Sequence, residues 1–223
     1  MQDGMLDAFF NLDIFRQVLP LMGKGLWMTF RLSLFTIALG LSFGLLIALG
    51  VTQRTSRGLR IALTIYIDLF RALPPLVLLI FISFLIHFWG MEWSNWGIIA
   101  LSFTLSTACY YGEILRAGIE AVPQGQIEAS RSTGMSATQT LRCIVLPQAF
   151  RSTNPELCSN SLLVIKMTAI ASVVGLQDLL GMARNAQSLL YSPAPLILCA
   201  LIYLVLLWPA VRWVSNMSER EVR

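Results

Sequence analysis

Long apolar runs recur along the whole chain, and short polar stretches separate them. A helix that crosses a bilayer needs about 20 mostly apolar residues. Runs of this length predict spans at 26–51, 61–89, 96–115, 156–176 and 196–214. The pattern therefore predicts an all-α integral membrane protein with about five transmembrane helices, in a single domain that covers residues 1–223.

Two of the runs contain residues that shape a helix. Gly40 and Gly44 place two small residues one turn apart, which lets another helix approach closely. Pro74 and Pro75 interrupt the run at 61–89, and consecutive prolines remove two backbone donors. We therefore expect the second span to be broken or kinked at these prolines.

Composition supports the membrane assignment. Of the 223 residues, 56% are hydrophobic and 13% are charged, with a mean hydropathy of +0.70. A soluble domain has about 25% charged residues, so this chain carries more apolar surface than such a fold can bury. The first 15 residues hold three aspartates and no basic residue, unlike a secretory signal. Residues 1–20 are therefore expected to be an extracytoplasmic segment.

Positive charge orients the predicted spans, because cytoplasmic loops collect lysine and arginine. In a five-helix topology one side receives the arginines of loop 53–60, segment 116–151 and the tail: Arg54, Arg57, Arg60, Arg116, Arg131, Arg142, Arg151, Arg212, Arg220 and Arg223. The other side receives only Arg16, Lys24 and Arg184. This bias places the N-terminus outside and the C-terminus in the cytoplasm. The net charge of +4 is too small to indicate nucleic-acid binding.

Residues 119–147 form a polar island between the third and fourth spans, on the predicted cytoplasmic side. Pro123 suits the first turn of a helix, and Glu128 is then expected near the positive end of the helix dipole. Gly134 predicts a stop or a bend. From these residues alone, a solvated hairpin is an equally simple interpretation.

A second helix is predicted directly after Gly134. Ser136 and Gln139 have the spacing of a capping box, in which each side chain satisfies the backbone of the other residue. An apolar face follows, and Pro147 is expected to end this helix or to bend the chain into the next span. The island thus predicts two short helices that meet at Gly134.

The sequence of the island resembles that of a known family. The stretch Ile119-Glu-Ala-Val-Pro-Gln-Gly-Gln-Ile-Glu-Ala-Ser130, followed by Gly134-Met135 and Leu146-Pro147-Gln-Ala-Phe150, is similar to the "EAA" loop of ABC importer permeases. The similarity is to their polar amino acid branch, the histidine, glutamate, glutamine, arginine and opine group. Further similar stretches are Gly25–Thr29, Asp68–Pro75, Tyr110–Gly118 and Lys166–Gly175.

The resemblance implies a type I importer-like permease subunit of five or six helices in a bacterial inner membrane. It implies that the chain pairs with a second permease subunit and two ATPase subunits, which bind the ATP and magnesium, and that an extracytoplasmic binding protein delivers an amino acid or opine. In the family, the loop docks in a groove of the ATPase. The residues implied in this coupling are Glu128, Ala129, Ser130, Gly134, Met135, Leu146 and Pro147.

Two residues depart from the family pattern. Ser130 replaces an expected alanine, and because both are small, we expect close packing against the ATPase to be kept. Met167 replaces the aspartate of a Lys-Asp-Thr stretch. The loss of that acid suggests that a partner subunit supplies part of the substrate site.

Ionisable groups within spans are costly and usually face a partner or a watery cavity. Glu113 is expected to pair with Arg116 on one helix face, or to line a cavity. Arg71, beside the paired prolines, lines a substrate path built on a broken helix or anchors the helix end. Lys166 attracts a substrate carboxylate or pairs with an acid of a partner.

Two hydroxyl side chains complete the candidates for the substrate path. Thr168 and Ser172 share one helix face, where they bond back to the backbone or contact the ligand. His87, the single histidine, is expected at the outer interface.

Enzymatic alternatives find little support in the residues. The chain has no G-x-x-x-x-G-K-[ST] motif, so no P-loop for ATP is predicted, and its four cysteines have no metal-ligand spacing. No Ser/His pair suggests an intramembrane protease. A secondary transporter of small polar solutes is the main alternative, although no internal repeat supports it.

Overall fold

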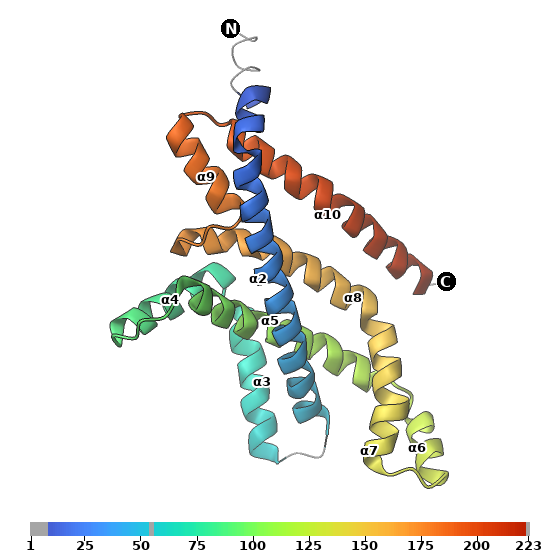
Figure 1. Ribbon diagram of the computed structural model, residues 1–223. Helices are drawn as coiled ribbons and strands as arrows, with labels where there is room; N and C mark the ends of the chain where they lie inside the picture. The colour runs from blue at the N-terminus through green and yellow to red at the C-terminus, as the bar shows by residue number, and fades with distance from the viewer. Residues whose placement is uncertain (1–8, 54–55, 222–223) are drawn as a thin grey trace. The chain divides into compact units, whose positions relative to one another are not determined.

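The computed structural model describes residues 9–53 and 56–221, and the regular elements within these ranges are helices (Figure 1). In chain order they are α2 (Leu12–Thr52), α3 (Arg57–Ala72), α4 (Pro75–Phe88), α5 (Asn95–Glu120), α6 (Gln124–Ser132), α7 (Ala137–Thr140), the π-helix η1 (Leu141–Val145), α8 (Leu146–Met167), the 3₁₀ helix η2 (Thr168–Val174), α9 (Leu179–Leu190) and α10 (Ala194–Glu221). This confirms the prediction of an all-α chain.

In the part of the chain that the structure describes, four helical stretches are long and apolar enough to cross a membrane, and a fifth is present if α3 and α4 form one broken span. The four are Leu12–Thr52, Asn95–Glu120, Ala137–Val174 and Ala194–Ser218. The prediction of about five spans is confirmed. The helix of the first span, α2, begins at Leu12 and not near residue 26, because backbone hydrogen bonding continues beyond the apolar run. Residues 1–8 of the expected extracytoplasmic segment lie outside the described residues. The same holds for Arg54 and Arg223, which are predicted to be cytoplasmic.

The predicted break in the second span lies between α3 and α4. Leu73 is extended, with φ −82° and ψ 125°, because the ring of a following proline disfavours helical backbone in the preceding residue. Pro75 then begins α4, where its missing N–H costs no hydrogen bond. The paired prolines therefore end one helix and start the next.

The helices contribute to two compact units, and the first contains residues up to Thr36, Pro75–Ser102 and Leu162–Trp213. Its core packs α2 against α9 and α10 through Val18, Met22, Leu179, Ala183, Ala186 and Cys199. Asp178 is fully buried and caps α9, accepting hydrogen bonds from the backbone N–H groups of Gly181 at 3.0 Å and Leu180 at 3.4 Å. The backbone N–H of Leu179 donates to Thr29 Oγ1 on α2 at 3.1 Å, which fixes α9 to this helix.

The second unit contains Ile37–Pro74, Phe103–Ser161 and the residues after Trp213. Its core lies among α2, α5, α6, η1 and α8 and includes Ala48, Tyr111, Leu115, Ile119, Val122, Val145, Ala149 and Leu157. A Cβ on Gly44 would lie 2.6 Å from Tyr111 Cβ and 2.8 Å from the backbone nitrogen of Gly112. The small residue predicted to allow close helix approach therefore brings α2 directly against α5.

Candidate functional site

The polar island folds into a helical hairpin, in which residues 133–136 join α6 to α7. Pro123, predicted in the first turn, occupies the N-cap position just before the first helical residue, Gln124, and Glu128 lies in the middle of the nine-residue helix. Glu128 is thus not at the positive end of the helix dipole as expected, because the helix starts four residues earlier, at Gln124. It projects from an exposed face instead.

Gly134 ends α6 in the way that its sequence predicts. It adopts φ +89°, a left-handed conformation that favours glycine. The backbone N–H of Gly134 donates to Arg131 O at 3.1 Å, and that of Met135 donates to Ser130 O at 3.3 Å. These two bonds are those of a Schellman cap, which satisfies the last carbonyls of the helix.

The second helix of the hairpin begins with the predicted capping box. Ser136 Oγ accepts from the backbone N–H of Gln139 at 3.2 Å, and Gln139 Oε1 accepts from the backbone N–H of Ser136 at 2.7 Å. Pro147 does not end this helix, since α7, η1 and α8 follow one another without a break.

A wider turn explains how Pro147 is accommodated. In the π-helix η1, the backbone N–H of Leu146 donates to Leu141 O, five residues back. A proline ring normally crowds the carbonyl four residues before it, and the wider helical turn just ahead of Pro147 provides room. The short helix predicted after Gly134 is therefore the first part of the long stretch that becomes the fourth span.

The outer and inner faces of α6 differ sharply. Glu128 and Ala129 are exposed, whereas Ser130 is 7% exposed. Ser130 Oγ lies 2.8 Å from Ile127 O and 3.0 Å from Oγ1 of the buried Thr140. Ser130 therefore packs inside the hairpin, against α7, and not against an external partner as expected from its place in the motif.

A second polar contact joins α6 to α8. Gln148 Nε2 donates to Gln126 Oε1 at 2.6 Å and to Ile144 O at 2.9 Å. Sequence reasoning missed both Thr140 and Gln148, because their partners are 10 and 22 residues away and no local pattern predicts such pairs. Together the two contacts fix α6 to the start of the fourth span.

Charged side chains of α3 and α5 form a cluster in the same unit. Arg116 donates to both carboxylate oxygens of Glu113, at 2.7 and 2.8 Å, and to Glu120 at 2.6 Å. The predicted Glu113–Arg116 pair is confirmed. Arg71 Nη1 lies 3.8 Å from Glu113 Oε1, and its guanidinium carbon lies 6.0 Å from the centre of the Tyr110 ring. Arg71 therefore links the end of α3 to α5 next to the proline break.

The other predicted candidates lie in the first unit, at the α8–η2 junction. Thr168 Oγ1 donates to Ile165 O at 2.7 Å, and Ser172 Oγ donates to Ala169 O at 2.9 Å. Both hydroxyls thus bond back to their own helix. Thr168 is fully buried and Ser172 is half-buried.

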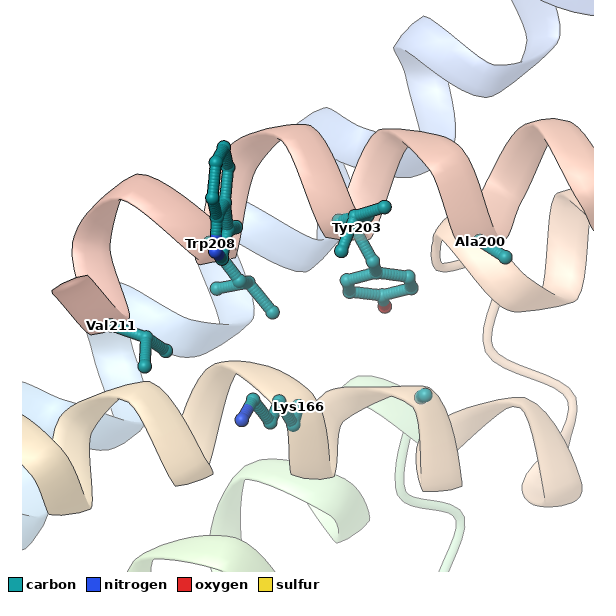
Figure 2. A pocket seen from close by; sticks show the side chains of 8 residues that line it. Lys166, Ala200, Tyr203, Trp208 and Val211 are labelled. Atoms are coloured by element: carbon teal, nitrogen blue, oxygen red, sulfur yellow. The ribbon is translucent and has the colours of Figure 1, made fainter.

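Lys166 lines a groove of about 510 Å³ between the α8–η2 segment and α10. Figure 2 shows Tyr203 of α10 directed toward α8, with Lys166 on the facing side of the groove. The walls are otherwise apolar and include Leu204, Leu207 and Trp208. Within the described residues, Lys166 has no carboxylate partner. The groove can therefore offer one ammonium group to an anionic ligand in apolar surroundings.

Comparison with known proteins identifies the architecture. Residues 40–222 match the family of binding-protein-dependent transport system inner membrane components. The chain is 30% identical over 217 residues to the arginine transport system permease protein ArtQ of Bacillus subtilis, covering 96% of this chain and 98% of that protein. It is 34% identical over 221 residues to the octopine transport system permease protein OccM of Rhizobium meliloti, covering 89% and 87% of the two chains.

A solved structure agrees with these relatives. A chain of the crystal structure of an amino acid ABC transporter with histidines superposes with a TM-score of 0.83 at 32% identity, covering 92% of this chain and 96% of that one. The helical bounds, the hairpin at Gly134 and the match over residues 40–222 lead to one conclusion. The chain belongs to the family of binding-protein-dependent transport system inner membrane components.

Proposed function

We propose that this chain is the membrane-spanning subunit of an ATP-driven importer for an amino acid or opine, and that α6 couples it to the ATPases. The named relatives transport arginine and octopine, and the solved relative is an amino acid transporter. In this proposal two ATPase subunits bind the ATP and magnesium. A second permease subunit completes the pore, and an extracytoplasmic protein delivers the substrate.

The observation that supports coupling through α6 is its two-faced packing. Glu128 and Ala129 face outward, while Ser130 and Gln126 are hydrogen-bonded to Thr140 and Gln148. A partner that pushes on the outer face would move α6 and the first turns of the fourth span together. The hairpin would then transmit the closing of the ATPases to the helices that line the pore. Met135 lies in the turn between α6 and α7, and Leu146 and Pro147 begin α8.

Two variants test the coupling. Glu128→Lys reverses the charge of the outer face, and Gly134→Asp strains the left-handed residue that ends α6. In the purified complex, both are expected to lower binding-protein-stimulated ATP hydrolysis and uptake by about tenfold or more, while the permease still inserts into the membrane. Glu92→Lys, the same charge reversal on an exposed residue before α5, serves as control. Normal ATPase co-purification and uptake in both variants would refute the coupling role.

For the substrate we propose a path that includes Lys166, because its ammonium group lines an apolar groove without a carboxylate partner in the described chain. Thr168 and Ser172 lie on the same segment as Lys166 and bond back to their own helix, and Arg71 and Glu113 hold the broken second span. Met167 cannot supply the acid that relatives carry next to the lysine, so the partner subunit would contribute the remaining polar contacts. Lys166→Met should raise KM for uptake, whereas Lys24→Met, which removes an exposed lysine of α2, should not. An unchanged KM for Lys166→Met across a panel of amino acids and opines would exclude this path.

A further inference from the structure

A second cavity, of about 660 Å³, lies in the unit that contains the hairpin, and the transport mechanism above does not use it. Its walls come from the end of α2, the first turn of α3, the end of α5, α6 and the α7–η1 segment. Five helical segments therefore meet around one space.

The polar part of the cavity is positively charged. Arg60 and Arg131 both line it. Arg60 Nη2 donates to the carbonyl of Gln53 at 3.4 Å, and Arg131 Nη1 donates to Met135 O at 2.8 Å. Within the described residues neither guanidinium is paired with a carboxylate.

The one acidic residue in the lining does not cancel this charge. The carboxylate of Glu120 is held by Arg116 at 2.6 Å, and Arg116 is itself outside the lining. Gln53 and Gln124 add amide groups that can donate hydrogen bonds to an anion. The cavity thus offers two guanidinium groups and two amides to a negatively charged group.

Thr52 and Thr140 add hydroxyl groups, and the rest of the lining is apolar, including Val51, Val122, Ile127, Leu141 and Val145. The cavity also has a defined depth, since it lies where the apolar helices α2 and α5 end, at Thr52 and Glu120. The arginine distribution assigns these helix ends to the cytoplasmic side. A ligand that fits must therefore combine an anionic head with an apolar body at the inner surface of the membrane.

We propose that this cavity binds the phosphate head group of an anionic phospholipid from the inner leaflet. Arg60 and Arg131 contact the phosphate, the two glutamines complete its hydrogen bonds, and the valine and leucine side chains cover the glycerol and upper acyl chain. Basic pockets between transmembrane helices on the cytoplasmic side bind anionic head groups in this way. Because Arg60 belongs to α3 and Arg131 to α6, the lipid would bridge the second span and the coupling hairpin.

The test measures lipid binding directly, so its outcome is independent of whether α6 couples transport. The complete transporter is reconstituted in nanodiscs of phosphatidylglycerol and phosphatidylcholine, and the retained lipid is counted by native mass spectrometry. We expect phosphatidylglycerol to be retained preferentially. The double variant Arg60→Gln/Arg131→Gln should weaken its binding by about tenfold or more. Arg57→Gln removes an exposed arginine from the same first turn of α3, outside the cavity, and should bind like the wild type.

Further measurements distinguish lipid binding from the binding of other ligands, and a loss of binding from misfolding. Arg60→Lys keeps the charge and should retain most of the binding, and thermal melting confirms that each variant is folded. Equal retention of phosphatidylglycerol in the double variant and the Arg57 control would overturn the proposal. So would equal retention of phosphatidylcholine, or full displacement of the lipid by millimolar inorganic phosphate. Loss of the ATPase subunits without loss of lipid would show a protein contact and would likewise overturn it.

Discussion

Replacing Ser130 with alanine tests how α6 is held to the rest of the hairpin. Ser130 is 7% exposed and its hydroxyl lies 3.0 Å from Thr140 Oγ1, and Thr140 is 3% exposed. A hydrogen bond of this kind contributes about 1 kcal/mol, and its loss leaves the buried threonine hydroxyl without this partner. The outer face, Glu128 and Ala129, is unchanged by the substitution. We therefore expect weaker attachment of α6 without a change in the outer face that we propose contacts the ATPase.

Hydrogen exchange measures this attachment at single amides. A loss of about 1 kcal/mol raises the opening equilibrium about fivefold, so the amides of Gly134 and Met135 should exchange about five times faster in Ser130→Ala. Ser132→Ala is the matched control, because Ser132 is exposed and its hydroxyl bonds only to Glu128 O within α6. Its exchange rates should stay within a factor of two of the wild type.

A double-mutant cycle decides whether the Ser130–Thr140 contact is responsible. Thr140→Val removes the other hydroxyl at nearly constant volume, and the double variant should cost less than the sum of the single variants by 0.5 kcal/mol or more, as an order of magnitude. If the amides of Ser130→Ala and Ser132→Ala exchange at the same rate, or if the coupling energy is zero, the Ser130–Thr140 hydrogen bond does not hold α6 to α7.

Three further predictions concern the helix contacts and the buried acid. Gly44→Ala should destabilise the fold, because the new Cβ would lie 2.6 Å from Tyr111 Cβ. A Cβ at Gly23 would meet nothing within 4 Å, so Gly23→Ala should stabilise α2 by up to about 1 kcal/mol. Thermal melting compares the two variants. Glu113→Gln removes the carboxylate shared by two arginines and should lower the free energy of unfolding by about 1–2 kcal/mol. Glu120→Gln, whose side chain is 52% exposed, should lower it by less than about 0.5 kcal/mol. Equal shifts in melting temperature for the two variants would contradict the ion-pair network around Glu113. Burial raises the pKa of Asp178 from 3.8 to about 6, so the fold favours the protonated acid, and stability falls as pH rises through 6.

The pH dependence of stability that Asp178 causes can be measured. Lowering the pH from 7 to 5 should stabilise the protein by about 1 kcal/mol, or about 3 °C in melting temperature. Asp178→Asn keeps a side-chain oxygen to cap α9 and has no charge, so this part of the pH dependence should disappear. An identical pH dependence in the variant would show that the carboxylate is not responsible.

Local chemistry in the sequence predicted several elements in detail. Pro74 and Pro75 break the second span, Gly134 ends α6, and Ser136 starts the next helix, because each of these effects depends on backbone geometry within a few residues. The Glu113–Arg116 pair was also predictable, since residues three apart share a helix face.

Other features were missed or wrongly assigned because their causes lie further along the chain. Pro147 was expected to end a helix, and the preceding π turn, which no short motif announces, makes room for it. Ser130 was expected to face the ATPase, but the rotation of α6 relative to α7 turns it inward to Thr140. The pairing of Gln126 with Gln148 depends on two helices folding back on each other.

The sequence by itself determined that the chain crosses a membrane, that it has about five spans and to which family it belongs, and it predicted which side its arginines face. These properties follow from apolar length, charge placement and short backbone motifs, all of which act locally. Only the tertiary structure decided which face of α6 is free and that Arg71 joins the Glu113 cluster. It also decided that Arg60 and Arg131 share one cavity. These features depend on helix rotation and on contacts between segments that are distant in the chain. The packing energies that determine them arise between such segments, so no single stretch of sequence predicts them.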